Sequence, residues 1–371
     1  MAKYYGSDDD DQLEGGRDDD IVRGFDGDDA LSGGRGDDRL LGDDGDDELE
    51  GERGDDDLFG GGGEDLLAGG ADDDDLHGGL GDDRLSGATG DDDLFGQAGN
   101  DRLAGGGGRD RLAGGIGNDV YFIDHPSEIL RTQSDPGRDR VVTDFTYRLG
   151  ASQEDLQLLG DENRNGFGTN ARNKLLGNEG DNGLVGRGGD DILSGDDGDD
   201  RLYGMVGDDT LLGGDGDDRL NGGVGDDRLD GDDGSDVLLG AAGDDLLVYD
   251  EDDALAFGSV GFDTLLVDAS DDLVLDLDNL AGDELRGFER IDLSGEGDHE
   301  LRFDLGDLLA MGATGNQFFV TGDADDSVVS TGQNWVADPG GNEVRDGVSY
   351  AAFGAGAVTL FVDVDLATTL S

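Results

Sequence analysis

Apolar residues recur at every ninth position over residues 6–122 of the chain. When this stretch is cut into blocks of nine that begin at Gly6, the eighth residue of every block is apolar, from Leu13 to Tyr121. The seventh residue is usually polar, as Gln12 and Arg39 are. A strand over the last three residues of a block would direct the eighth side chain to one face and its neighbours to the other. One apolar side chain per block is too little to fold alone, so we expect stacked coils whose apolar residues form an internal ladder.

Glycine and aspartate hold fixed places in the same blocks. The first residue of each block is Gly, from Gly6 to Gly114, and the sixth is Asp, from Asp11 to Asp119. Because Gly makes up about a fifth of the chain, thirteen in register by chance is on the order of one in a billion. The pattern therefore indicates structural repeats rather than a low-complexity sequence.

A second array begins near Gly168 and continues in the same phase to Val248. Its sixth positions hold Asn173 and Asn182 in the first two blocks and Asp in the next seven. Its eighth positions are all leucine, namely Leu175, Leu184, Leu193, Leu202, Leu211, Leu220, Leu229, Leu238 and Leu247. We therefore expect the same coil in both arrays.

Each block is expected to contain a tight turn. Gly at position one, and usually at position four, permits the positive φ values of such a turn and the close approach of neighbouring backbones. Asp9, Asp18 and Asp72 replace Gly at the fourth position. We expect these three residues to distort their turns.

Two blocks would complete one coil and form two short parallel sheets. Stacking would then place every second Asp turn directly above another, about 4.8 Å away. Two carboxylates at that spacing repel by roughly 1 kcal/mol even in bulk water, so a column of them needs a cation between successive turns. Ca²⁺ suits this role because it takes about 6–8 oxygen ligands at ~2.3–2.6 Å, whereas Mg²⁺ demands tighter octahedral geometry. If each ion joins a block to the second block after it, the arrays offer ~11 and ~5 sites.

The composition strengthens the case for a bound cation. The chain has 371 residues, of which 94 are acidic and 25 basic, and its formal net charge is −69. So large a charge with 34% hydrophobic residues is typical of a disordered chain unless a cation neutralises it. The same field would repel nucleic acid and anionic membrane surfaces.

Several other classes of structure are excluded. The chain has no cysteine, so disulfides and thiolate zinc sites are impossible. No apolar run approaches the ~18 residues of a membrane-spanning helix. The first residues, MAKYYGSDDDDQLEGG, lack the apolar segment of a Sec signal peptide. We therefore expect a chain without a membrane span.

The blocks resemble GGxGxDxUx, the nonapeptide of the RTX (haemolysin-type calcium-binding) family. GGRGDDRLL, GGLGDDRLS, GGIGNDVYF and GGVGDDRLD carry this resemblance. It implies a right-handed parallel β-roll in which the sixth-position Asp and turn carbonyls bind Ca²⁺ between neighbouring coils. The implied metal ligands are Asp11, Asp20, Asp29, Asp38, Asp47, Asp56, Asp65, Asp74, Asp83, Asp92, Asp101, Asp110, Asp119, Asp191, Asp200, Asp209, Asp218, Asp227, Asp236 and Asp245. Asn173 and Asn182 depart from the pattern, so the ligand role is not carried over to them.

The remaining segments also resemble parts of secreted repeat proteins. Residues 123–167 are similar to the strand-rich stretch that often separates two RTX arrays, here 1–122 and 168–248. Residues 249–371 resemble the C-terminal modules of large bacterial repeat adhesins, which implies a β-rich capping or secretion region. Proteins of this family leave the cell by type I secretion, with an uncleaved C-terminal signal. The acidic and apolar end of the chain, AVTLFVDVDLATTLS, is compatible with that signal.

Other candidate sites have simpler interpretations. The fifth-position acids, among them Asp28, Asp37, Asp46, Asp55 and Asp82, are expected to be plain surface charges. We expect the scattered histidines to lie on the surface or to have satisfied hydrogen bonds rather than to bind a transition metal. These are His77, His125 and His299.

The sequence gives little evidence for catalysis. GVSYA at 347–351 faintly matches a nucleophile elbow, but the strand–turn–helix context and a partner His are missing. The aromatic residues near the C-terminus are expected to form the core of a β region rather than a ligand-binding patch. They are Phe318, Phe319, Trp335, Tyr350, Phe353 and Phe361.

Three functions are compatible with these observations. The first is a secreted, non-catalytic calcium-binding protein of bacterial origin that folds when it meets external Ca²⁺ and serves adhesion or an extracellular matrix. The second is the calcium-dependent accessory part of a secreted protease, lipase or polysaccharide epimerase whose catalytic domain lies elsewhere. The third, an acidic disordered chain, is disfavoured because runs such as LVLDLDNL and AVTLFVDVDL require a folded partner.

Overall fold

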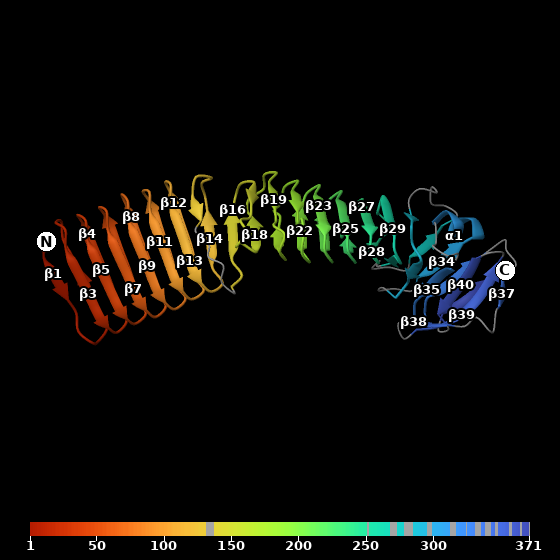
Figure 1. The fold of residues 1–371 in the computed structure, drawn as a ribbon, viewed down its shortest axis with the longest axis horizontal. Coiled ribbons are helices and arrows are strands. Elements are labelled where there is room, and N and C mark those ends of the chain that lie inside the picture. The colour runs from red at the N-terminus through yellow and green to blue at the C-terminus, as the bar shows by residue number, and fades with distance from the viewer. Residues whose placement is uncertain are drawn as a thin grey trace. The chain divides into compact units, whose positions relative to one another are not determined.

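The chain folds into stacked coils of parallel β-strands, shown in a computed structural model (Figure 1). The structure describes residues 1–130, 137–250, 252–267, 273–277, 285–294, 299–311, 317–323, 325–330, 335–337, 343–345, 348–355, 358–363 and 366–370. It divides into two compact units, Met1–Leu159 and Gly160–Ser371. The division falls within residues 123–167, the segment expected to connect the arrays.

Two parallel sheets make up the N-terminal unit. One contains β1 (Lys3–Tyr5), β3 (Ile21–Asp26), β5 (Arg39–Asp44), β7 (Asp57–Gly62), β9 (Asp75–Leu80), β11 (Asp93–Ala98), β13 (Arg111–Ile116) and β15 (Ile129–Leu130). The other contains β2 (Gln12–Glu14), β4 (Ala30–Arg35), β6 (Glu48–Arg53), β8 (Leu66–Ala71), β10 (Arg84–Thr89), β12 (Arg102–Gly107), β14 (Val120–Ile123), β16 (Arg140–Thr143) and β18 (Asp155–Leu158). The short strand β17 (Tyr147–Arg148) also belongs to this unit. Consecutive strands of the array alternate between the two sheets, so two blocks complete one coil and the predicted all-β parallel roll is confirmed.

The C-terminal unit continues the same plan. One sheet contains β19 (Asn165–Phe167), β21 (Gly183–Val185), β23 (Arg201–Val206), β25 (Arg219–Val224), β27 (Val237–Ala242), β29 (Leu255–Val260) and β32 (Leu285–Arg286). The second contains β20 (Lys174–Leu176), β22 (Ile192–Asp197), β24 (Thr210–Asp215), β26 (Arg228–Asp230), β28 (Leu246–Tyr249), β30 (Thr264–Val267), β33 (Arg290–Asp292), β35 (Gln317–Thr321) and β40 (Val358–Asp363). A smaller sheet contains β31 (Val274–Asp276), β34 (Glu300–Phe303), β36 (Ser327–Ser330) and β41 (Ala367–Leu370).

The apolar ladder lies where the repeat predicts it. Leu58 pairs with Leu40 on one side and with Leu76 on the other, and all three are 0% exposed. Burying a leucine stabilises a fold by about 1.5–3 kcal/mol. The stacked leucines therefore supply the cohesion that no single block possesses.

Most strands within the arrays are longer than the three residues predicted. Strand β5, for example, has six residues and spans the last three positions of one block and the first three of the next. Pairing continues beyond the apolar position because Asp43 lies opposite Gly61 in the following coil. Leu40 and Gly42 of β5 point inward and are buried, so the first-position Gly lies inside the roll.

Antiparallel strands extend the second sheet beyond its last parallel strand. Strand β39 (Val348–Ala355) pairs antiparallel with β40, and β37 (Val336–Ala337) and β38 (Glu343–Arg345) pair with β39. The helix α1 (Leu305–Met311) lies between β34 and β35 in the sequence. Within the described residues no helix is long and apolar enough to cross a membrane.

The predicted aromatic core is confirmed in part. Phe319, Tyr350 and Phe361 form a buried cluster, in which Phe319 stacks on Phe361 with ring centroids 4.7 Å apart. Trp335 packs elsewhere, edge-on to Phe303 at 6.3 Å. The reason is topological, since Trp335 precedes β37 whereas the cluster is built by β35, β39 and β40.

Candidate metal sites

The sixth-position Asp residues form columns at the ends of the strands. In each column, Oδ1 accepts a hydrogen bond from the backbone N–H of the sixth residue one coil earlier. Asp38 N–H donates to Asp56 Oδ1 at 2.7 Å, and Asp56 N–H donates to Asp74 Oδ1 at 2.9 Å. From Asp20 to Asp119 these side chains are at most 4% exposed. The structure therefore brings the predicted ligands together along each column, 18 residues apart in sequence.

The second carboxylate oxygen, Oδ2, is buried and lacks a hydrogen-bond partner in most of these described residues. This holds for Asp29, Asp38, Asp47, Asp56, Asp65, Asp74, Asp83, Asp92, Asp101, Asp110, Asp191, Asp200, Asp209, Asp218, Asp227, Asp236 and Asp245. A buried charged acceptor left without a donor costs more than the ~1–3 kcal/mol of a neutral one. The repetition of this cost along every column indicates that a cation neutralises these oxygens.

The first-position glycine is required by this carboxylate. A Cβ added to Gly42 would lie 2.0 Å from Asp47 Oδ2 and 2.7 Å from the carbonyl oxygen of Gly60. No side chain can occupy that space without displacing the carboxylate and the backbone of the next coil. The carboxylate oxygen of Asp47 and the main-chain carbonyl oxygen of Gly60 thus lie close together at this turn.

The prediction that position one adopts positive φ is wrong. Positive φ occurs at positions two and four, as in Asp43 at 81° and Gly45 at 144°. Asp72, at position four, adopts a φ of 83° and therefore does not depart from the common turn. Asp9 and Asp18 do depart from it, because neither is among the described residues with positive φ.

Burial raises the pKa of the column carboxylates. Desolvation is the largest cause, and it raises the pKa of Asp47 to about 6, of Asp56 to about 7 and of Asp74 to about 8. In the second array, desolvation likewise raises the pKa of Asp218 to about 8. The hydrogen bond that each carboxylate accepts from a backbone N–H of the previous coil lowers its pKa, but it does not cancel the effect of desolvation. Without a metal the pKa values of these four carboxylates therefore lie near neutral pH, and a nearby cation would favour their ionised form.

The available donors fit Ca²⁺. Within the described ranges, no three or more His, Asp or Glu side chains gather closely enough to hold a metal ion. An ion at these turns must therefore combine carboxylate oxygens with main-chain carbonyls or water. Ca²⁺ accepts such a mixed and flexible set of oxygens, while Mg²⁺ prefers a tighter octahedron.

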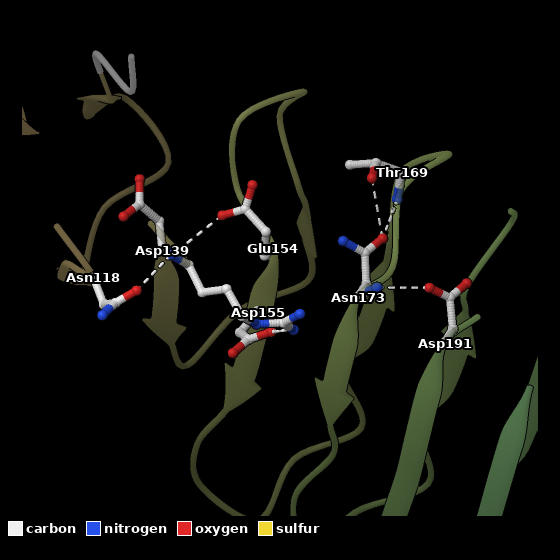
Figure 2. A network of polar contacts seen from close by, with 8 residues as sticks. Asn118, Asp139, Glu154, Asp155, Thr169, Asn173 and Asp191 are labelled. Atoms are coloured by element: carbon white, nitrogen blue, oxygen red, sulfur yellow. Dashed lines mark hydrogen bonds and ion pairs between the residues drawn. The ribbon is translucent and has the colours of Figure 1, made fainter. Parts of the chain in front are cut away.

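Four turns satisfy the sixth-position oxygen in another way. At Asp11, Asp20, Asn173 and Asn182, a side-chain oxygen accepts a hydrogen bond from the backbone N–H of position two in the same turn. Figure 2 shows this contact between Thr169 and Asn173. These turns are the first two of each array.

The fifth-position acids are exposed, as expected, yet they also form a ladder. Asp46 N–H donates to Asp28 Oδ1 at 2.9 Å, and Glu64 N–H donates to Asp46 Oδ1 at 2.8 Å. The fifth-position side chain therefore accepts from the following coil, whereas the sixth-position side chain accepts from the preceding one. Residue type and spacing alone do not reveal this difference in direction.

Asp263 is a column residue that the sequence interpretation missed. It is 0% exposed, its Oδ1 accepts from Asp245 N–H at 3.0 Å, and its Oδ2 has no hydrogen-bond partner among the described residues. Desolvation raises its pKa to about 7. The signal was available, because GSVGFDTLL begins at Gly258 in the phase of the second array, beyond one block with Ala254 at its sixth position.

Other acids extend the columns outside the nine-residue phase. Asp119 N–H donates to Asp139 Oδ1 at 3.1 Å, and Asp139 N–H donates to Glu154 Oε2 at 2.8 Å, as Figure 2 shows for the second bond. In the other unit, Asp263 N–H donates to Glu289 Oε2 at 3.0 Å. These residues carried no repeat signal, since the intervals between partners differ from 18 residues.

The histidines do not gather into one site. His77 stacks between Phe59 and Phe95, with centroid distances of 4.8 Å to each. His125 Nδ1 lies 2.6 Å from Ser127 Oγ on the surface. His299 departs from expectation, because it is 1% exposed and its Nε2 has no hydrogen-bond partner in the described structure.

The segment that resembles a nucleophile elbow has a different context. Ser349 lies within β39 and pairs with Val344 of β38 in an antiparallel sheet. It is therefore not placed at a strand-to-helix turn. Gly347, the first residue of this match, lies outside the described residues.

The fold and the columns together define a calcium-binding repeat protein. The family model of the RTX calcium-binding nonapeptide repeat matches residues 5–40, 32–67, 54–85, 86–121, 176–211 and 212–247, which is just over half of the chain. The chain belongs to this family, and its repeats bind several Ca²⁺ ions.

Similarity to solved structures and to curated proteins gives no further information about the fold or function of the chain. Among solved structures, the chain matches the crystal structure of extracellular lipase LipA from Serratia marcescens at 15% identity and a TM-score of 0.14. The match covers 88% of this chain and 42% of the lipase chain, so the chain spans less than half the length of that protein. This likeness is too weak to bear on fold or function. No curated protein matches the chain.

Proposed function

We propose that this chain is a secreted, non-catalytic protein that folds on binding Ca²⁺ outside a bacterial cell and serves adhesion or an extracellular matrix. The observation that carries the proposal is the set of buried Oδ2 atoms without hydrogen-bond partners, repeated along the columns of both arrays. A fold with so many uncompensated carboxylates is favoured only when cations are available to neutralise them.

The mechanism is thermodynamic linkage. An ion that binds the folded state alone stabilises it by RT ln(1 + [L]/Kd) at each site, and the sites in one column act on one cooperative fold. Where free calcium is scarce, as in a cytosol, the chain stays expanded and can pass through type I secretion machinery. Outside the cell, Ca²⁺ binds the turns and the coils close.

The proposed ligands are the sixth-position Asp residues of residues 1–122 and 168–248 that lie after the first two turns of each array, together with Asp263. Asp11 and Asp20 are therefore not among them. Asp263 shares the features of the interior turns, because a Cβ on Gly258 would lie 2.6 Å from Asp263 Oδ2 and 2.2 Å from the carbonyl oxygen of Gly287. Each such carboxylate would use Oδ1 to hold the previous coil and Oδ2 to bind the ion.

The test is a Ca²⁺ titration of the chelator-stripped full chain, followed by far-UV circular dichroism, with Mg²⁺ as the control ion. We expect a cooperative rise in β signal with Ca²⁺ and a much weaker response to Mg²⁺. A spectrum that stays disordered at millimolar Ca²⁺ would refute calcium-driven folding. A spectrum already rich in β-structure without Ca²⁺ would show that the leucine ladders suffice to fold the chain.

Secretion and adhesion need separate tests. Antibodies should detect the native protein in the culture medium or on the surface of the bacteria that produce it, and recovery from the cytoplasm alone would contradict secretion. Purified protein should bind immobilised matrix polymer or cells with Ca²⁺ present and should dissociate when a chelator is added. Equal binding with and without Ca²⁺ would argue against adhesion through the folded arrays.

A further inference from the structure

The first two turns of each array have a backbone conformation of their own. In every later turn of the arrays, positions two and four both have positive φ, as in Glu52 at 76° and Gly54 at 114°. In the turns that begin at Gly6, Gly15, Gly168 and Gly177, neither position is among the described residues with positive φ. These first two turns make up one coil of each array. We call them the leading turns, and all later turns of the arrays the interior turns.

The leading turns neutralise the sixth-position oxygen with a main-chain donor. Ser7 N–H donates to Asp11 Oδ2 at 2.6 Å, and Gly16 N–H donates to Asp20 Oδ2 at 3.0 Å. In the second array, Asn173 Oδ1 accepts from position two at 2.6 Å and Asn182 Oδ1 does so at 2.7 Å. The oxygen that lacks a partner in the interior turns is therefore hydrogen-bonded here, and it requires no cation.

The carbonyl at position four is also rotated in the leading turns. Where the turn one coil earlier is an interior turn, a Cβ on the fourth-position Gly would lie closest to the fourth-position carbonyl oxygen of that turn, as at Gly45, where Gly27 O is 2.1 Å away. Where the turn one coil earlier is a leading turn, the closest atom is instead the carbonyl carbon, at 2.9 Å for Gly27 and 2.8 Å for Gly198. The rotation moves a potential oxygen ligand away from the place that it occupies in all later turns.

Local side chains support this conformation. The side-chain oxygen of position two accepts from the N–H of position four at Ser7 (3.3 Å), Thr169 (3.1 Å) and Asn178 (3.4 Å). Ser, Thr and Asn favour such turns because their short side chains bond to the backbone two residues further on. Three of the four leading turns thus hold their shape through bonds that involve no metal.

We propose that the leading coil of each array is a calcium-independent cap, in which Asp11, Asp20, Asn173 and Asn182 bind no Ca²⁺. The N–H donor of position two takes the place of the ion, and a neutral Asn serves as well as Asp because it keeps the acceptor oxygen. Each cap presents a formed edge on which the metal-dependent coils stack. The inference rests on the proposed function, since it presumes that the interior turns bind Ca²⁺.

The experiment counts Ca²⁺ ions bound to the full chain by equilibrium dialysis and follows folding by circular dichroism. The variant Asp11→Asn/Asp20→Asn is compared with Asp56→Asn/Asp65→Asn, which also changes one residue in each column but lies in the interior. We expect the first variant to bind as many ions as wild type and to fold at the same Ca²⁺ concentration. The interior variant should bind at least two fewer ions than wild type and should fold only at a higher Ca²⁺ concentration.

The opposite substitutions give an independent test. Asn173→Asp/Asn182→Asp supplies the consensus carboxylates without changing the turn, so we expect no additional ions. An equal loss of ions in both Asp→Asn variants, or a gain of ions in the Asn→Asp variant, would overturn the cap while leaving calcium-driven folding intact. Failure of the wild-type chain to bind Ca²⁺ would overturn both proposals.

Discussion

We expect the calcium-free protein to fold when the pH is lowered. The perturbation is a decrease in the pH of the chelator-stripped chain from about 8 to about 5, where the chain is still anionic because its pI is about 4.1. Burial raises the pKa of the column carboxylates, for example from 3.8 to about 7 at Asp56. Between these two pH values the folded state binds a proton that the unfolded state has lost. Each such group therefore contributes stability that is full below pH 3.8 and is lost as the pH rises through about 7.

The size of the effect follows from the same values. At ~1.4 kcal/mol per pH unit, ionising Asp56 costs the fold about 4 kcal/mol at pH 8, and lowering the pH to 5 recovers roughly 2–3 kcal/mol of this. Asp65 and Asp101, with pKa values of about 7, behave alike. Three such groups recover roughly 8 kcal/mol, which is comparable to the whole stability of a typical domain, about 5–15 kcal/mol. We therefore expect protons to replace Ca²⁺ in neutralising the columns.

The assay is far-UV circular dichroism with size-exclusion chromatography, between pH 8 and pH 5, in calcium-free buffer. The calcium-saturated protein at pH 8 serves as the folded reference. We expect a disordered, expanded chain at pH 8 and a compact, β-rich chain near pH 5. If the calcium-free chain remains expanded at pH 5 although Ca²⁺ folds it at pH 8, charge in the columns is not what opposes folding.

Three further predictions concern single residues. Asp56→Asn should lower the number of bound Ca²⁺ ions, whereas Asp55→Asn in the exposed fifth-position ladder should not; equal losses in equilibrium dialysis would contradict the assignment of ligands. Gly42→Ala should destabilise the calcium-loaded fold by about 1–3 kcal/mol, because its Cβ would lie 2.0 Å from a carboxylate oxygen. Gly62→Ala is its control, since the closest atom to that Cβ would be 3.5 Å away, and similar melting temperatures for both variants would refute the steric argument. Leu76→Ala should cost about 2–5 kcal/mol in thermal or denaturant unfolding without changing the ion count, because this fully buried side chain belongs to the ladder.

The repeat period was enough to predict the ladder and the columns. Two blocks make a coil, so residues 18 apart must lie side by side, and Leu58 meets Leu40 and Leu76 for this reason. Asp56 lies next to Asp38 and Asp74 for the same reason. Partners outside the period, such as Asp119 and Asp139, which are 20 residues apart, give no periodic signal and could not be predicted.

Position one is glycine for a different physical reason from the one predicted. The sequence predicts that position one must be Gly, and Gly42 is indeed required. The reason, however, is the carboxylate of Asp47 and the carbonyl of the next coil rather than a positive φ value. Neighbouring coils create this crowding, so no single block contains the information.

The sequence by itself determined that the chain is a stack of nine-residue repeats with inward leucines, regularly placed carboxylates and a need for a cation. These properties follow from a period, from the net charge and from the chemistry of the residue types. Only the tertiary structure decided which oxygen of each carboxylate holds the neighbouring coil and which is left for an ion. It also separated the leading turns from the interior turns, although Asp20 and Asp29 occupy the same place in the repeat. The physical reason is that hydrogen-bond direction and peptide orientation depend on contacts with the coils before and after a turn, while the residues of the turn itself, such as Ser7 and Thr169, only favour one of the possible shapes.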